Sequence, residues 1–403
     1  MEYKISNRLK MGAIIMIVLG ALGVAYGFFD SQGYTEANIT ERLAEEHHGH
    51  GDAHAEDTHT DSHAEADLHV EDSHGEEAHG ASHADEDHGM SHEEHVLHQI
   101  HNRPYSALYV AAFFFFMIAL GVLAFYAVQY ASQAGWSPVL FRVMEGITAY
   151  VLPGGLIVLA IAFLADSHLF VWLKEGMTTE GHDNYDALVA GKSGWLNKPW
   201  FFIRGLIFLG GWYAYRHFSR KFSVAQDNTD VNDNRYFKKN FRISAAFLVF
   251  FIYTESMMSW DWIMSVDPHW FSTLFGWYLL AGMLVCGITV IAMIAIYLKS
   301  KGLLEHVNDS HIHDLAKFMF GFSIFWTYLW FSQFMLIWYS NIPEEVTYFV
   351  TRIEDYNLPF FGMVAMNFVF PFLLLMNSDY KRIPWFVVMA GIVILCGHYV
   401  DIF

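Results

Sequence analysis

The stretch 105-YSALYVAAFFFFMIALGVLAFYAVQYA-131 contains no Asp, Glu, Lys, Arg or His in its 27 residues. About 20 consecutive apolar residues are enough to cross a bilayer as a helix, so this stretch predicts a membrane-spanning helix. Hydrophobic residues make up 54% of the chain and charged residues only 16%, whereas soluble proteins carry about 25% charged residues. The sequence therefore predicts an all-α, polytopic integral membrane protein.

Nine apolar runs can be recognised along the chain. The first, which follows Lys4, Arg8 and Lys10, resembles a signal peptide, but we expect it to remain as an anchored helix because it has no clear cleavage site. The nine runs cover residues 11–29, 105–131, 139–165, 199–217, 241–260, 271–298, 316–339, 358–377 and 383–403.

Basic residues indicate the orientation of these runs. If the amino terminus is cytoplasmic, 16 of the 23 Lys and Arg residues fall on the inner side and 7 on the outer side. Cytoplasmic loops are generally enriched in Lys and Arg. We therefore expect a cytoplasmic amino terminus and an outward-facing loop between the first two runs.

That loop is acidic and rich in histidine. Between Glu41 and Glu94 there are 18 acidic residues against one Arg, and 15 of the 23 histidines lie between His47 and His101. Such a composition buries too little apolar surface to order a chain, so the predicted state is disorder. Weak metal binding and a pH-responsive tether are the alternatives; the candidate ligands for a metal are His47, His48, His50 and His54.

The net charge of −19 belongs mainly to this loop. The sequence has no stripe of basic residues that could bind the phosphates of a nucleic acid.

The two cysteines, Cys286 and Cys396, lie far apart inside apolar runs. Without CxxC or CxxCH, the sequence has no basis for binding its own iron–sulfur cluster or c-type haem.

Polar side chains recur near the predicted outer ends of the runs. An ionisable group at membrane depth is costly and is therefore a functional candidate. Quinol oxidation releases two protons, and His or Asp acceptors in an aromatic slot suit that reaction. The candidates for a quinone or proton site are Asp166, His168, Glu255, Asp261, Asp267, His269, Gln333, His398 and Asp401.

Simpler interpretations stay open for several of these residues. In 259-SWDWIMSVDPHWFS-272 the tryptophans fit an interfacial belt, and Asp267 is expected to open the sixth helix near its positive end. Asp166 and His168 form either a carboxylate–imidazole pair or a helix cap. We expect Arg204 to snorkel to the surface.

The inner end of the third run offers a further candidate. Glu145 lies three residues after Arg142 on one helical face, so it forms either an intrahelical ion pair or an inner group that takes up protons. Gln333 is expected either to bond a neighbouring helix or to face a pocket.

Two blocks resemble a known family. The sequences SWDWIMSVDPHWFSTLFGWY (259–278) and HDLAKFMFGFSIFWTYLWFSQFMLIWYSNIPEE (313–345) resemble the ActF-type subunits of alternative complex III, the bacterial quinol:cytochrome c oxidoreductase, which are NrfD-like membrane proteins. The resemblance extends from Pro104 to the last residue, and the His-rich insertion also fits.

The resemblance implies ten helices, arranged as two four-helix bundles with one flanking helix at each end, of which this chain shows nine. The expected regions are a first helix (1–30), the acidic loop (31–103), a first bundle (104–260) and a second bundle (261–403). It further implies the bacterial inner membrane with the acidic loop periplasmic, and quinone or menaquinone as ligand.

The implied partners are an NrfD-like sister subunit, an iron–sulfur protein and c-type cytochromes that hold the clusters and haems, a terminal oxidase, and lipids. The resemblance thus implies a subunit that contributes to a quinone site and to proton translocation. A purely structural membrane anchor and an ion or proton transporter are the alternatives. The transporter is disfavoured because midplane helices broken at matching positions are absent.

Overall fold

The computed structural model describes residues 6–35, 92–230 and 232–403. The candidate metal ligands of the acidic loop, His47, His48, His50 and His54, lie outside these residues. Two compact units are distinguished, one comprising residues 15–104 and the other 1–14 with 105–403. The second unit holds every other candidate residue.

The secondary structure of the described residues is helical. Eight helices are long and apolar enough to cross a membrane, which confirms the all-α polytopic fold. The α-helices are α1 (Asn7–Gln32), α3 (His92–Ala131), α4 (Phe141–Ile147), α5 (Val151–Leu164), α6 (Asp166–Leu169), α7 (Ala187–Gly191), α8 (Lys198–Asp227), α9 (Arg235–Trp262), α10 (Phe275–Ser300), α11 (Asp309–Ser340), α12 (Pro343–Glu354), α13 (Asn357–Val364), α14 (Phe370–Leu375) and α15 (Pro384–Ile402).

The predicted run at 199–217 lies within α8, which is not among the eight spanning candidates. Its length of 30 residues suffices, but polar and basic side chains such as Arg204 and Arg216 dilute its apolar character. Among the described residues, eight of the nine predicted spans are thus supported by length and composition, and the span at 199–217 stays a prediction. The other eight runs each coincide with a spanning candidate.

Two predicted runs are interrupted helices. The run at 139–165 comprises α4, a 3₁₀ turn at Thr148–Tyr150 and α5. The run at 358–377 comprises α13, a π-helical turn at Ala365–Val369 and α14. Pro371 accounts for the second irregularity, because a proline inside a helix removes one backbone hydrogen bond and clashes with the preceding turn.

Helices α3 and α10 form the core of the second compact unit. A Cβ atom at Gly121 of α3 would lie 2.1 Å from the carbonyl oxygen of Met283, and one at Gly287 of α10 would lie 2.9 Å from the backbone nitrogen of Val122. Only glycine permits such close backbone approach, which is a common basis of helix packing in membranes.

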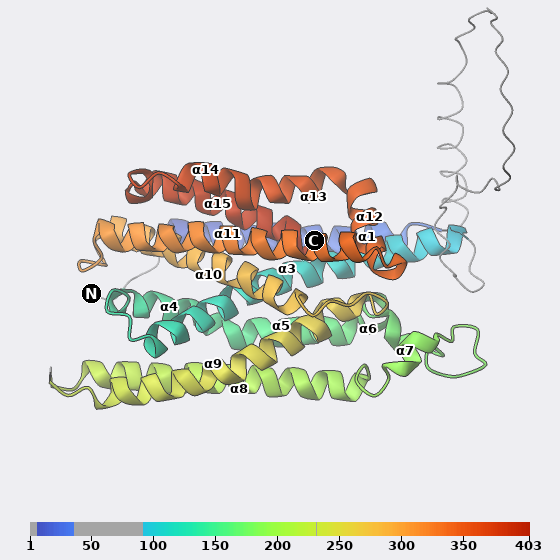
Figure 1. The fold of residues 1–403 in the computed structure, drawn as a ribbon, viewed down its shortest axis with the longest axis horizontal. Coiled ribbons are helices and arrows are strands. Elements are labelled where there is room, and N and C mark those ends of the chain that lie inside the picture. The colour runs from blue at the N-terminus through green and yellow to red at the C-terminus, as the bar shows by residue number, and fades with distance from the viewer. Residues whose placement is uncertain (1–5, 36–91, 231) are drawn as a thin grey trace, which may run out of the picture. The chain divides into compact units, whose positions relative to one another are not determined.

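The remaining helices of this unit pack around that core in sequence-adjacent groups. Helix α8 packs on α9 and on α5, whereas α10 packs on α11 and α15, and α14 packs on α11 and α15. Figure 1 shows α6, α7 and α12 toward one end of the helices and the α8–α9 and α10–α11 turns toward the opposite end. The hydroxyl of Tyr109 on α3 donates to the carbonyl of Trp262, at 2.8 Å, and fastens the end of α9.

Candidate functional site

The most concentrated polar cluster lies where α10, α11 and α15 meet. Asp401 of α15 accepts hydrogen bonds from the hydroxyl of Tyr278 on α10 and, at 3.2 Å, from the indole nitrogen of Trp326 on α11. His398, one turn earlier on α15, places Nδ1 3.5 Å from Asp401 Oδ2. The structure thus brings two sequence candidates together and adds Tyr278 and Trp326, so we call these four residues the α15 cluster.

His398 is the least satisfied member of the α15 cluster. Its side chain is fully buried, and neither ring nitrogen has a hydrogen-bond partner among the described residues. The ring stands edge-on to Trp326, with centroids 5.2 Å apart, and its Nδ1 would contact a Cβ atom at Gly282 at 3.7 Å. Since buried polar atoms without partners are costly, the unused hydrogen-bonding capacity of this imidazole makes His398 a candidate functional residue.

An aromatic stack joins this cluster to the 259–272 stretch. Tyr348 of α12 stacks on Trp270 with centroids 4.2 Å apart, and the guanidinium carbon of Arg352 lies 3.5 Å from the Tyr348 ring centroid. Trp270 in turn contacts Phe275 edge-on, at the start of α10. Burial raises the pKa of Tyr348 despite the opposing charge of Arg352, so the phenol remains protonated at neutral pH.

Asp261 has a different environment. Its carboxylate, which is fully buried, accepts two hydrogen bonds from Arg204, at 2.7 and 2.9 Å, and a third from the indole of Trp195 at 2.8 Å. The guanidinium carbon also lies 4.2 Å from the Trp195 ring centroid. The expectation that Arg204 snorkels is therefore wrong: 12% of its side chain is exposed, and it forms a bidentate ion pair.

The segment before α8 is fastened to the same stretch by two more contacts. His269 Nε2 lies 2.5 Å from Asp186 Oδ2, and Lys192 Nζ donates to the carbonyl of Pro268 at 2.6 Å. Burial opposes ionisation of Asp186, but the backbone N–H of Val189 and the His269 ring hold its pKa below the usual range. His269 therefore helps to attach a loop.

The expected role of Asp267 is wrong. Helix α10 begins at Phe275, eight residues later, with Leu274 as its N-cap. Asp267 instead accepts from the backbone nitrogens of His269 and Trp270, at 3.2 and 3.4 Å. Its carboxylate caps a local turn, as Asp commonly does.

Asp166 and His168 have separate partners. Asp166 forms an ion pair with Lys198 and accepts from the backbone nitrogen of Ser167 at 2.6 Å. Lys198 holds the pKa of the Asp166 carboxyl below its usual range. His168 stacks on Tyr105 with centroids 4.4 Å apart.

Glu255 lies inside α9 and is 1% exposed. Its Oε1 has no hydrogen-bond partner among the described residues, and its Oε2 lies 3.5 Å from the hydroxyl of Ser256. Because a buried ionised carboxylate needs compensating charge or hydrogen bonds, Glu255 is a candidate proton carrier. Gln333 of α11 is buried as well, at 5% exposure.

At the opposite end, Glu145 forms the intrahelical ion pair that its spacing predicts. Arg142 donates to it at 2.5 Å, and the buried hydroxyl of Tyr126 donates to its other oxygen at 3.0 Å. Arg142 also pairs with Asp227 at the end of α8. The side chain of Glu145 is nearly buried, whereas that of Arg142 is exposed. The ion pair therefore links Glu145 to the protein surface.

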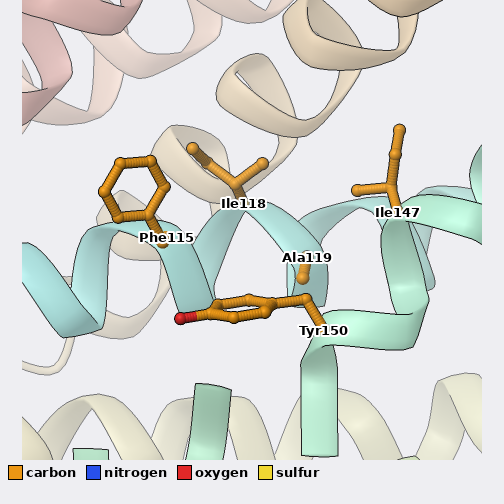
Figure 2. Close-up of a pocket in the computed structure, with 5 residues that line it drawn as sticks. All are labelled: Phe115, Ile118, Ala119, Ile147 and Tyr150. Atoms are coloured by element: carbon orange, nitrogen blue, oxygen red, sulfur yellow. The ribbon is translucent and has the colours of Figure 1, made fainter. Parts of the chain in front are cut away.

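A separate apolar groove lies between α3 and the 3₁₀ turn before α5. It encloses about 330 Å³ and is lined by Phe115, Ile118, Ala119, Ile147 and Tyr150. Figure 2 shows the Tyr150 ring lying along α3 below Ala119, with its hydroxyl directed toward Phe115. None of the candidate site residues lines this groove.

Sequence reasoning missed several participants. Tyr278 lies near the start of α10 and Trp326 in the middle of α11, and their roles depend on contacts between α10, α11 and α15 that the sequence does not report. Asn367 was missed too: it lies in the π-helical turn, is fully buried, and neither side-chain polar atom has a partner among the described residues. Pro371, four residues later, was the available signal for an irregular helix.

Among the described residues, no three His, Cys, Asp or Glu side chains are grouped as a metal site requires. Comparison with known proteins finds no matching family model and no matching curated protein. The fold and the buried polar groups define this chain as a polytopic helical membrane protein.

Proposed function

We propose that this chain is a membrane subunit of a respiratory quinol:cytochrome c oxidoreductase of the alternative complex III type, in which it helps to form a quinone site and accepts protons. The observation that carries the proposal is the α15 cluster, where a fully buried imidazole that forms no hydrogen bond with the described residues lies beside a carboxylate, a phenol and an indole. The resemblance of residues 259–278 and 313–345 to ActF-type subunits supports the same role.

The cluster suits the chemistry of quinol oxidation. The hydroxyl of a quinol can donate to an imidazole nitrogen, and the His398 ring nitrogens lie in aromatic surroundings without a hydrogen-bond partner among the described residues. A proton taken up by His398 has the Asp401 carboxylate 3.5 Å away to stabilise the imidazolium. The electrons pass to haems and iron–sulfur clusters in partner subunits, consistent with the absence of haem and cluster motifs from this sequence.

The location follows from the same proposal. The chain lies in the bacterial cytoplasmic membrane with its amino terminus inside, so that the α15 cluster faces the periplasmic half and Glu145 the cytoplasmic half. Glu145 and Glu255, both buried, are the carboxylates that the proposal assigns to proton transfer between the two halves.

Purification tests this assignment. The full chain, tagged and extracted from native membranes in mild detergent, should bring down c-type cytochromes that are visible in the reduced-minus-oxidised spectrum, together with quinol:cytochrome c activity. A chain that purifies as a stable species without redox-active subunits would contradict the proposal and favour the transporter. Redox partners whose activity survives every change in the α15 cluster would favour the structural anchor.

A further inference from the structure

The turn between α8 and α9 carries cations that no described carboxylate neutralises. Ion pairs at this hairpin join Arg142 to Asp227 and Arg235 to Asp233. Within residues 92–230 and 232–403, no ion pair involves the other basic residues of the hairpin, which are Arg216, Arg220, Lys221, Lys238, Lys239 and Arg242.

Arg216 is the most constrained of these cations. It is half-buried on α8, and its Nε is buried without a hydrogen-bond acceptor among the described residues. Arg220, one turn further along the same helix face, is exposed and adds a second positive charge that acts on Arg216. The carboxylate that acts on Arg216, Glu145, is already held by Arg142 and Tyr126.

Exposed apolar side chains lie more than two helical turns before these cations on α8. They are Ile203, Leu206 and Ile207, and Val249 is exposed on α9. Figure 1 shows α8 and α9 along one edge of the helices drawn for residues 105–403. A change from exposed apolar to exposed basic side chains along one helix marks the level at which acyl chains give way to headgroups.

We propose that Arg216 and Arg220 bind the phosphate of an anionic phospholipid. The Nη atoms of the half-buried Arg216 guanidinium supply donors for a phosphodiester, and Arg220 supplies the second charge. Acyl chains of the same lipid lie along the exposed apolar face of α8. This inference does not rest on the proposed function, because any membrane protein with this surface would bind such a lipid.

Lipid retention in a defined bilayer tests the site. The full chain is reconstituted into nanodiscs of phosphatidylcholine with a minor fraction of phosphatidylglycerol, then released into mild detergent for native mass spectrometry. We expect Arg216→Gln and Arg220→Gln each to lower the number of retained phosphatidylglycerol molecules, by about fivefold for each cation removed. Arg216→Lys should restore part of the binding, since it keeps the charge but loses the fork.

The double variant Lys299→Gln/Lys301→Gln is the matched control, because it removes two cations from the α10–α11 turn at the same end of the helices. Its retention of phosphatidylglycerol should stay well above that of Arg216→Gln/Arg220→Gln, because Lys299 is already paired with Asp309. Arg220→Gln changes an exposed side chain, so it also separates lipid loss from misfolding. Unchanged retention in Arg216→Gln/Arg220→Gln, equal loss in the control, or displacement of the lipid by millimolar inorganic phosphate would each overturn the proposal.

Discussion

The ion pair between Arg204 and Asp261 gives the most quantitative prediction. Asp261 is fully buried, 12% of the Arg204 side chain is exposed, and two hydrogen bonds of 2.7 and 2.9 Å join them. We consider Arg204→Leu, Asp261→Leu and the double change to Leu at both positions. Each single change leaves one charge without its partner, whereas the double change removes both.

The magnitude follows from burial. Removing one partner of a buried ion pair costs about 3–5 kcal/mol, whereas replacing both by apolar residues is often nearly neutral. Arg204→Leu is expected at the upper end, because the remaining carboxylate has no exposed surface and keeps only the Trp195 indole as a donor. Asp261→Leu is expected at the lower end, because the partly exposed guanidinium can reach water.

The assay is a double-mutant cycle on unfolding. The free energy of unfolding is measured for the wild type and the three variants by titrating the detergent-solubilised protein with SDS and following tryptophan fluorescence. We expect the coupling energy between the two sites to exceed about 2 kcal/mol. A coupling energy below about 1 kcal/mol, the range of exposed pairs, would refute the inference that this pair is buried and fastens the segment before α8.

Three further predictions concern packing, protons and pH. Gly121→Ala should destabilise the fold strongly because a Cβ there would meet the α10 backbone at 2.1 Å, whereas Gly146→Ala, with open space around it, should be neutral or stabilising in the same thermal unfolding measurement. Glu255→Gln should lower quinol:cytochrome c activity or proton coupling in proteoliposomes while the complex stays assembled; unchanged turnover and coupling would contradict a role for this carboxylate. Since Lys198 holds the pKa of Asp166 below about 3.9, the stability that this pair adds is present above that pH and is lost as pH falls through the lowered value. Asp166→Asn should therefore weaken the fall of the melting temperature at acidic pH. An unchanged fall would show that the Asp166–Lys198 pair contributes nothing to stability.

Much of the fold could be predicted from composition. The long uncharged runs predict spanning helices because the bilayer requires about 20 apolar residues regardless of the tertiary partners. The stretch at 199–217 contains Arg204 among the aromatic residues of α8, and its contacts with Asp261 and Trp195 explain how the helix accommodates this charge. The interruptions in the third and eighth runs depend on local backbone geometry, which hydropathy does not report.

The candidate site was predictable in part. The spacing of Glu145 after Arg142 predicts their ion pair, and that interpretation is confirmed. The spacing of Asp401 after His398 placed both on one face of a helix, and the structure brings them within 3.5 Å. By contrast, the sequence groups three other candidates with His398 and Asp401 only by their positions near helix ends. These candidates are Asp166, Asp267 and His269. Their partners are determined by loop contacts, which have no periodic signal in the sequence.

The central claim is that the α15 cluster accepts protons from quinol, and His398→Gln tests it most directly. The variant keeps a polar side chain of similar length but removes the imidazole that accepts the proton in the proposal. In the purified complex, quinol:cytochrome c activity should fall at least about tenfold, while haem content and subunit composition stay unchanged. Full activity in the assembled complex would contradict the claim.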